Sequence, residues 1–473
     1  MNENDDKAPA VLGQAGRAAL GSFLGAVVEW YDFLLYGIVA ALVFQKVFFP
    51  DVGPVVGTLA AFATFGVGFL FRPLGGIIFG HFGDKLGRKR MLLWTMSLMG
   101  AATFMIGVIP SYGTIGWAAP VLLVLLRIIQ GFAVGGEWGG AALMAVESAP
   151  SNRKTLFSSG VQVGYSTGLL LATAAVTVMS HFVGDAEFTA WGWRIPFLLS
   201  AVLVMVGLWV RKDVEESPTF LAAAEHRNES VEVTRRQRLP IVAAVRSNPG
   251  AFFRIIGLRL AELLTTYVVT TFALNYSTTH LHYNRDFMLG IGILVGTLGI
   301  ITVPCYAWLA DRYGLRRIYL LGATLGVLFT IPFWIALEQQ QRFLVVICAF
   351  VLVNGCNGMV VSVQQPLFVE MFGAQFRYSG AGVGYQIAST IGGGFTPFIA
   401  AGLTAAAGGA WYPTAVYVTA GCLISFLLMA TMKSRSPIEE SGTLPRKTPK
   451  ALRPLSVEPM PTSDSVIRPT GSQ

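Results

Sequence analysis

The stretch GSFLGAVVEWYDFLLYGIVAALVF, residues 21–44, is long enough to cross a lipid bilayer as a helix. A membrane-spanning helix needs about 20 predominantly apolar residues. Two carboxylates, Glu29 and Asp32, nevertheless lie inside this run. A carboxylate at membrane depth costs about 2.5–3.5 kcal/mol on insertion scales, so such groups usually face a protein interior and serve a function. The stretch therefore predicts a transmembrane helix that carries two functional acids.

The rest of the chain has the composition of a polytopic membrane protein. Its 473 residues are 53% hydrophobic and 13% charged, with a mean hydropathy of +0.59. Soluble domains carry about 25% charged residues. The apolar runs are continuous rather than alternating, which favours helices over a β-barrel. We therefore expect an all-α fold of twelve transmembrane helices. The predicted spans are 20–44, 55–79, 90–110, 119–142, 156–181, 191–210, 251–276, 287–309, 317–337, 342–366, 378–404 and 411–432.

Lysine and arginine set the predicted orientation. Of the 34 such residues, 27 fall in segments that would all lie on one side of the membrane, together with both termini. Basic loops stay in the cytoplasm, so both termini are expected there. The same rule explains the net charge of +8, and we do not infer nucleic-acid binding from it. The polar start of the chain lacks the layout of a signal peptide.

These features divide the chain into five predicted segments. A polar linker separates two sets of six spans, and the end of the chain is rich in proline and serine, a composition typical of disorder. The segments are a cytoplasmic N-terminal segment (1–19), a first six-helix bundle (20–211), a cytoplasmic linker (212–249), a second six-helix bundle (250–432) and a disordered cytoplasmic tail (433–473).

The two sets of six spans contain related sequences. The second predicted span is followed by GHFGDKLGRKR (80–90), and the eighth by AWLADRYGLRR (307–317). Both stretches carry an acid, then a base, then glycine and arginine. The offset from Asp84 to Asp311 nearly equals the offset from Glu147 to Glu370 after the fourth and tenth spans. These equal offsets predict two pseudo-symmetric bundles from a duplicated unit, which is one way that transporters build a central site.

The stretch GHFGDKLGRKR resembles the signature loop between helices 2 and 3 of the major facilitator superfamily. The resemblance implies that this loop and its second copy latch the two bundles together in one conformation. The alternative interpretation is a basic loop that only sets topology. The residues assigned to this conformational latch are Gly83, Asp84, Gly87, Arg88, Asp311 and Arg312.

Further motifs resemble the metabolite:proton symporter branch of that superfamily. They are EWYDFLLYG (29–37), RIIQGFAVGGEWGG (127–140), WGWRIPFLLS (191–200) and EESPTF (215–220). The resemblance implies a carrier, not an enzyme, in the inner membrane of a bacterium. It would import a small organic acid with protons by alternating access. Shikimate is the leading substrate; a dicarboxylate such as oxoglutarate, an aromatic acid, or a zwitterionic osmolyte such as proline or betaine are alternatives. A membrane receptor or sensor is the alternative from a different class.

Three polar residues are candidates for proton coupling: Asp32, Glu29 and Arg127. The two acids lie three residues apart, so they share a helix face with Tyr36 one turn further on. Arg127 cannot lose its proton and needs an anion at all times. We expect a helix carboxylate and a substrate carboxylate to compete for it, which would couple substrate to proton. The alternatives are a structural hydrogen bond for the acids and a permanent ion pair for the arginine.

Polar residues at helical spacing within other spans are candidates for substrate binding, since such stripes face a cavity or another helix rather than lipid. Hydrogen bonds between helices are the alternative role for each, and a mutual ion pair is the simpler interpretation of Arg259 and Glu262. The candidates are Arg127, Arg72, Tyr36, Gln130, Gln162, Tyr165, Arg259, Glu262, Asn354, Asn357, Gln364 and Gln386.

No cofactor is expected, because the transmembrane proton gradient would supply the driving force. The sequence contains no Walker motif. Its four cysteines have no metal-ligand spacing, so no metal site is expected. The predicted partners are a small organic acid, protons and membrane lipid, with no nucleic acid, and the protein is expected to function as a monomer.

Overall fold

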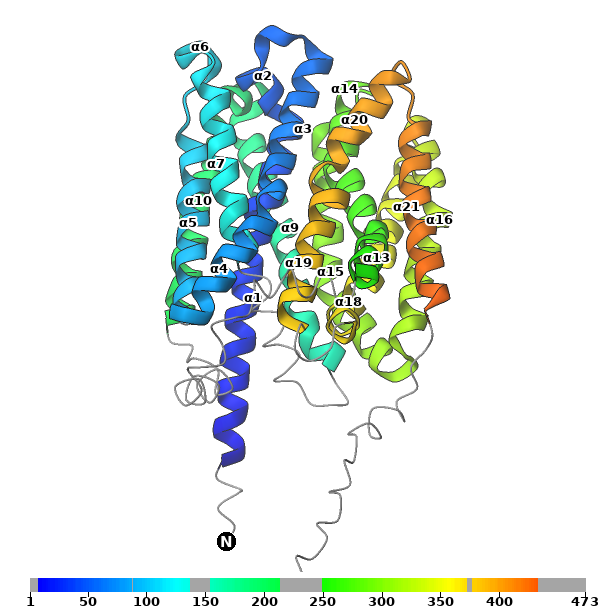
Figure 1. Cartoon of the computed structure of the whole chain (residues 1–473). Coiled ribbons are helices and arrows are strands. Elements are labelled where there is room, and N and C mark those ends of the chain that lie inside the picture. Colours follow the sequence, from blue (N-terminus) through cyan, green and yellow to red (C-terminus); the bar gives the residue numbers. More distant parts are fainter. Residues whose placement is uncertain (1–6, 87, 137–153, 213–248, 372–376, 433–473) are drawn as a thin grey trace, which may run out of the picture. The chain divides into compact units, whose positions relative to one another are not determined.

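The computed structural model describes residues 7–86, 88–136, 154–212, 249–371 and 377–432. The described residues up to Thr431 belong to one compact unit. Helices make up all the regular structure of these described ranges (Figure 1).

Helices in the first part of the chain include the first six predicted spans. They are α1 (Lys7–Val39), η1 (Ala40–Phe44), α2 (Gln45–Phe48), η2 (Pro50–Val52), α3 (Pro54–Leu70), α4 (Arg72–Leu86), α5 (Arg88–Val108), α6 (Tyr112–Ile115), α7 (Ala118–Gly135), α9 (Lys154–Glu187), η3 (Phe188–Gly192) and α10 (Arg194–Lys212).

Helices after the linker include the last six predicted spans. They are α13 (Pro249–Tyr267), η5 (Val268–Phe272), α14 (Ala273–Thr279), α15 (Arg285–Tyr313), α16 (Leu315–Glu338), α17 (Arg342–Phe350), η6 (Val351–Asn357), α18 (Gly358–Glu370), α19 (Arg377–Ser389), η7 (Thr390–Gly394), α20 (Thr396–Ala406) and α21 (Tyr412–Thr431).

The predicted all-α membrane fold is confirmed. Within the described residues, 11 helical segments are long and apolar enough to cross a bilayer, and a shorter apolar helix covers 194–210. Each of these corresponds to one of the twelve predicted spans. The largest difference is in the fifth span, where the helical segment extends to Gly192 rather than ending near residue 181. In Figure 1, α1 begins and α21 ends at the same end of the bundle, as an even number of crossings requires.

π-helical turns add structural support to the sequence duplication. One such turn, Ala40–Phe44, interrupts the first span, and another, Val268–Phe272, interrupts the seventh. The offset between them is close to the offset between Asp84 and Asp311. A π-turn inserts an extra residue into the helix and is found disproportionately at functional sites. The two spans therefore carry the same irregularity at corresponding positions.

Small residues let α7 pack directly on the backbones of α3 and α4. A Cβ atom added to Gly131 would overlap the carbonyl oxygen of Gly68, and one added to Gly135 would overlap that of Arg72. Interhelical seams of small residues are the usual device for close packing in membranes. The seam fixes Arg127 of α7 and Arg72 of α4 beside each other in the interior.

The first and last six spans contact each other at both ends of α9. Near the start of α9, the backbone N–H groups of Thr155 and Leu156 donate to the Asp311 carboxylate at 3.2 and 3.0 Å. Beyond the kink at its other end, Asp185 pairs with Arg285. Asn275 Nδ2 also donates to the carbonyl oxygen of Ala41 at 2.7 Å. The two sets of helices are thus joined on either side of their middle.

We predict that Gly131→Ala destabilises the protein. The new methyl group would meet a backbone carbonyl that cannot rotate away, and overpacking of this kind costs about 1–3 kcal/mol. The Tm of the purified protein in detergent should fall by a few degrees. Gly290→Ala is the matched control, since nothing lies within 4 Å of a Cβ at that helical position. Equal melting of both variants and the parent would contradict the packing described here.

Candidate functional site

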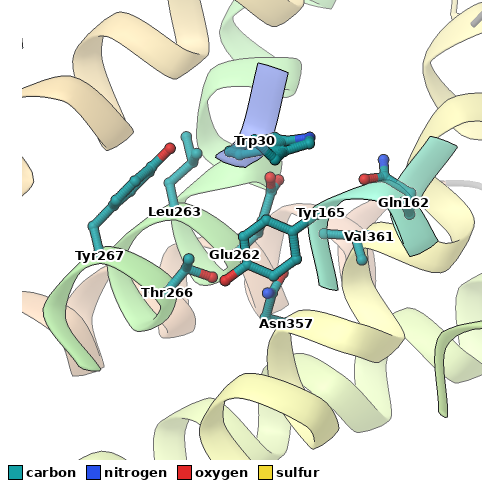
Figure 2. Close-up of a pocket in the computed structure, with 9 residues that line it drawn as sticks. All are labelled: Trp30, Gln162, Tyr165, Glu262, Leu263, Thr266, Tyr267, Asn357 and Val361. Atoms are coloured by element: carbon teal, nitrogen blue, oxygen red, sulfur yellow. The ribbon is translucent and has the colours of Figure 1, made fainter. Parts of the chain in front are cut away.

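A small cavity of about 10 Å³ lies between the first and last six spans. That is about the space that one water molecule needs, whereas ligand pockets commonly measure about 300–1,000 Å³, so the site is nearly closed in this conformation. Both halves contribute to its wall (Figure 2). The lining residues are Trp30, Gln162, Tyr165, Glu262, Leu263, Thr266, Tyr267, Asn357 and Val361.

The pocket wall carries an unusual set of buried polar atoms. Within the described structure, five of its lining side chains each have a buried polar atom that has no hydrogen-bond partner or, for the hydroxyls of Tyr165 and Thr266, only the other of the two. A buried polar group left without a partner costs about 1–3 kcal/mol, so a cluster of them points to a ligand. These atoms are Gln162 Nε2, Tyr165 Oη, Thr266 Oγ1, Tyr267 Oη and Asn357 Oδ1. Together they offer hydroxyl and amide groups to a ligand with several polar substituents.

Aromatic contacts fix the rings around the pocket. Trp30 meets Tyr165 edge to face, with 5.0 Å between ring centroids. Tyr267 lies against Phe65 and Phe69 of α3, at 5.6 and 5.7 Å. In Figure 2 the Tyr165 hydroxyl points toward Thr266, with Trp30 above the Glu262 carboxylate. Such packed rings hold their hydroxyl groups in defined positions.

The acid in the pocket wall is already paired. Arg259 donates to both carboxylate oxygens of Glu262, at 2.8 and 3.1 Å. Gln364 Nε2 donates to the same carboxylate at 2.7 Å. Arg259 also donates to the Tyr385 carbonyl oxygen and to Ser389, and its guanidinium lies over the Tyr385 ring. Arg259 and Glu262 thus form the mutual ion pair that was the simpler interpretation of their spacing.

Some of the hydrogen-bond donors of the Arg72 guanidinium have no partner in the described structure. Its guanidinium lies between the rings of Phe33 and Phe69, 3.9 and 4.0 Å from their centroids. Its closest carboxylate is Glu29, with 3.9 Å between Nη1 and Oε1. In the described structure, Nε and Nη2 of Arg72 have no hydrogen-bond partner. Because Phe69 also contacts Tyr267, Arg72 lies one aromatic ring away from the pocket.

Asp32 and Arg127 are joined through two other side chains. Thr103 Oγ1 donates to Asp32 Oδ2 at 2.7 Å, and Gln130 Nε2 donates to Thr103 Oγ1 at 2.6 Å. Arg127 donates in turn to Gln130 Oε1, and also to the carbonyl oxygen of Phe65, both at 3.0 Å. The direct carboxylate contact expected for Arg127 is therefore replaced by a hydrogen-bonded chain.

The predicted substrate residues fall into two groups. Gln162, Tyr165, Glu262 and Asn357 line the pocket. Four others make contacts elsewhere. Tyr36 shares a hydrogen bond with Thr64 and lies under the Arg127 guanidinium, and Gln130 belongs to the chain described above. Asn354 donates to the Val295 carbonyl oxygen and Gln364 donates to Glu262, although Oδ1 of Asn354 and Oε1 of Gln364 have no partner in the described structure. Gln386 is buried on α19, outside the pocket lining.

Sequence reasoning missed five residues of this region: Trp30, Leu263, Thr266, Tyr267 and Thr103. A signal existed for some of them, because Thr266 follows Glu262 by four residues and so shares its helix face. Trp30 and Tyr267 read as ordinary apolar residues of a span. Thr103 carries no sequence signal, since a lone threonine in a transmembrane helix usually bonds to its own backbone.

The structure describes only some of the residues of the predicted latch. Gly87 lies outside the described residues, as do the side chains of Asp84 and Arg88 and the surroundings of Gly83. Asp311 caps the start of α9, and Arg312 lies 5.7 Å from the centroids of the Trp308 and Tyr313 rings.

The chain belongs to the major facilitator superfamily, whose family model matches residues 53–385 and 263–460. The shikimate transporter of Escherichia coli (strain K12) is 59% identical over 433 residues, which cover 92% of this chain and 98% of that protein. The proline/betaine transporter of the same strain is 34% identical over 444 residues, or 92% and 86% of the two chains. Both relatives are transporters, and the family predicted from the motifs is confirmed.

Solved structures share the fold. The partially occluded inward open conformation of the xylose transporter XylE from E. coli matches with a TM-score of 0.69 at 18% identity. The match covers 90% of this chain and all of that one. The predicted superfamily fold is therefore confirmed.

We predict that Glu262→Gln strongly destabilises the protein. Removing one partner of a buried ion pair leaves the other charge uncompensated, which costs about 3–5 kcal/mol. The double variant Arg259→Met/Glu262→Gln should regain much of that loss, because no buried charge remains. Thermal unfolding of the three proteins in detergent measures this. If the double variant melts below Glu262→Gln, the cost comes from packing rather than from the unpaired charge.

Proposed function

We propose that the protein is a proton-coupled secondary transporter that imports a small organic acid, with shikimate as its substrate. The observation that carries the proposal is the 59% identity to the E. coli shikimate transporter over nearly the full length of both chains. The function predicted from the motifs and the relationship point the same way.

The chemistry of the pocket supports this substrate. Shikimate is a six-membered ring that bears one carboxylate and three hydroxyl groups. The five buried polar atoms, three of them without any partner, supply hydroxyl and amide groups from three elements around the cavity. Recognition by hydrogen bonds is selective, because an analogue that lacks a hydroxyl leaves the matching protein group unpaired. The aromatic rings would pack against the carbon ring between these contacts.

We assign the substrate carboxylate to Arg72. Arg259 is saturated by Glu262, Tyr385 and Ser389. Arg127 donates to Gln130 and Phe65, and only its Nε lacks a partner in the described structure. Arg72 retains two donors, and its guanidinium fork can bind a carboxylate bidentately. Its present neighbour, Glu29, would compete with the substrate for it. Proton uptake by Glu29 would then release Arg72 for the substrate.

Alternating access follows from the contacts at the two ends of α9. Breaking the Asp311 contacts would open the pocket toward the side where α1 begins, and breaking the Asp185–Arg285 pair would open it toward the other side. We place the first side in the cytoplasm of a bacterium, on the distribution of lysine and arginine. The carrier would lie in the inner membrane and function as a monomer, with the proton gradient in place of any cofactor.

A zwitterionic osmolyte is the second candidate substrate, because three aromatic residues line the pocket. Trp30, Tyr165 and Tyr267 could surround a quaternary ammonium group, a common use of aromatic cages. The state of the acidic residue in the pocket wall does not favour such a cationic ligand. Glu262 is neutralised by Arg259 and would give a cation little net attraction.

We predict that the purified protein in proteoliposomes accumulates labelled shikimate under an imposed inward proton gradient. Arg72→Lys should lose most of this uptake, because an ammonium group cannot bind a carboxylate in the bidentate geometry of arginine. Arg342→Lys is the control, at an exposed position at the start of α17.

Two results would revise the proposal. Accumulation of labelled betaine or oxoglutarate without shikimate would keep the carrier and replace its substrate. Full uptake by Arg72→Lys would move the carboxylate to another arginine.

We predict that Tyr165→Phe and Thr266→Val each raise the KM for shikimate up to about tenfold. Each change removes one hydrogen bond of about 0.5–1.5 kcal/mol and keeps the packing. Competition by cyclohexene-1-carboxylate, which has no ring hydroxyls, should be unaffected by either change. Tyr412→Phe is the control, since that side chain is exposed at the start of α21. Parallel losses for both compounds would indicate a packing defect.

A further inference from the structure

Thr103 stands between the buried acid Asp32 and the rest of the polar chain in the first six spans. Its side chain is fully buried on α5, as are those of Asp32 on α1 and of Gln130 and Arg127 on α7. The interior of a membrane-spanning bundle contains no bulk water that could satisfy a polar group when it loses its partner. The hydrogen bonds of Thr103 therefore constrain what Asp32 can do.

The hydroxyl of Thr103 faces two acceptors but has one proton. Its oxygen lies 2.7 Å from Asp32 Oδ2 and 3.0 Å from the carbonyl oxygen of Met99, one turn earlier in α5. A hydroxyl donates one hydrogen bond and accepts up to two. Gln130 Nε2 occupies one of the acceptor positions, at 2.6 Å. The second donation site, at Met99, is within reach by rotation of the hydroxyl proton alone.

These distances allow two complete hydrogen-bond patterns. When Asp32 is ionised, Thr103 donates to the carboxylate and accepts from Gln130. When Asp32 is protonated, the carboxyl group donates to Thr103, and the threonine proton turns to the Met99 carbonyl oxygen. Gln130 keeps its acceptor in both patterns, so its bond from Arg127 also persists. Neither pattern leaves the threonine hydroxyl or the Gln130 amide N–H without its partner.

We propose that Thr103 is the positioning residue that allows the buried carboxyl of Asp32 to gain and lose a proton, by switching its hydroxyl between the Asp32 carboxylate and the Met99 carbonyl oxygen. The proposal rests on the proposed function, a proton-coupled carrier, and adds to it a proton-carrying role for Asp32 beside that of Glu29. It adds a residue that the motifs do not identify. The switch moves one hydrogen atom and no heavy atom of the backbone.

Several charged or titratable groups face the same region. On α1 itself they are Glu29, Tyr31 and Tyr36. From other elements they are Arg127 of α7 and Arg72 of α4, both of which lie over the Phe33 ring of α1. All five remain in place when Thr103 is changed. If the midpoint of the Asp32 titration shifts when Thr103 is replaced, we therefore assign the shift to the loss of the threonine hydroxyl.

Infrared spectroscopy of the reconstituted full-length protein tests the switch without any substrate. The C=O stretch of a protonated carboxyl is followed against pH, and the part absent from Asp32→Asn is assigned to Asp32. In Thr103→Val, which keeps the shape but removes the hydroxyl, the midpoint should rise by about one to two pH units, because the ionised form loses the hydrogen bond that Thr103 donates. Thr103→Ser should keep the parent midpoint.

Thr95→Val is the matched control. Thr95 is also buried on α5, but its hydroxyl donates to the Leu92 carbonyl oxygen of its own helix. This variant should titrate like the parent. A parent-like midpoint in Thr103→Val would overturn the proposal, and so would an Asp32 band that does not titrate in the parent between about pH 4 and 10.

Shikimate counterflow, measured without a proton gradient, separates this proposal from the proposed function. Counterflow by the parent with an unshifted Thr103→Val band would reject the switch and keep the substrate. A shifted band without shikimate counterflow would keep the switch and reject the substrate.

Discussion

A charged group buried in a membrane protein must have a partner, and the interior of this protein is organised by that constraint. Three arginines, Arg72, Arg127 and Arg259, are almost wholly removed from solvent within the spans. Each remains charged, so each needs anions, carbonyl oxygens or aromatic faces around it. The three arginines meet this need with different partners. Under the proposed function, these partners suit them to different roles.

Arg259 is fixed, whereas Arg72 is available. The bidentate pair with Glu262 satisfies Arg259, and Gln364 completes the carboxylate, so this cluster forms a rigid wall of the pocket. Arg72 rests between two phenyl rings with a long contact to Glu29. Rings hold a guanidinium without using its hydrogen bonds. Under the proposed function, that arrangement keeps the buried cation stable until a substrate carboxylate binds to it.

The polar groups of the two halves have separate tasks under the proposed function. Carboxylates that can exchange protons, Glu29 and Asp32, lie on α1 in the first half. Much of the pocket wall, including Thr266, Tyr267 and Asn357, comes from the second half. Aromatic contacts of Tyr267 with Phe65 and Phe69 connect the two regions. Movement of one half against the other would change these contacts, so access to the pocket and the environment of the acids would change together.

The sequence by itself determined the membrane fold of this protein. Continuous apolar runs fix the number and positions of the spans, because hydrocarbon tolerates only a helix whose backbone is fully hydrogen-bonded. Matched motifs after the second and eighth spans identified the duplication and the superfamily. Four of the polar residues that the sequence singled out inside spans, Gln162, Tyr165, Glu262 and Asn357, line the pocket.

Only the tertiary structure decided how those residues are used. Helical spacing shows which residues share a face, but it does not show which partner on another helix a side chain meets. Arg127 therefore looked like a direct partner of Asp32, whereas Thr103 and Gln130 stand between them. Asn354 looked like Asn357 in sequence, yet it donates to a backbone carbonyl of α15. Partner choice depends on distances of a few ångströms between helices, and those distances are set by the packing of the whole bundle.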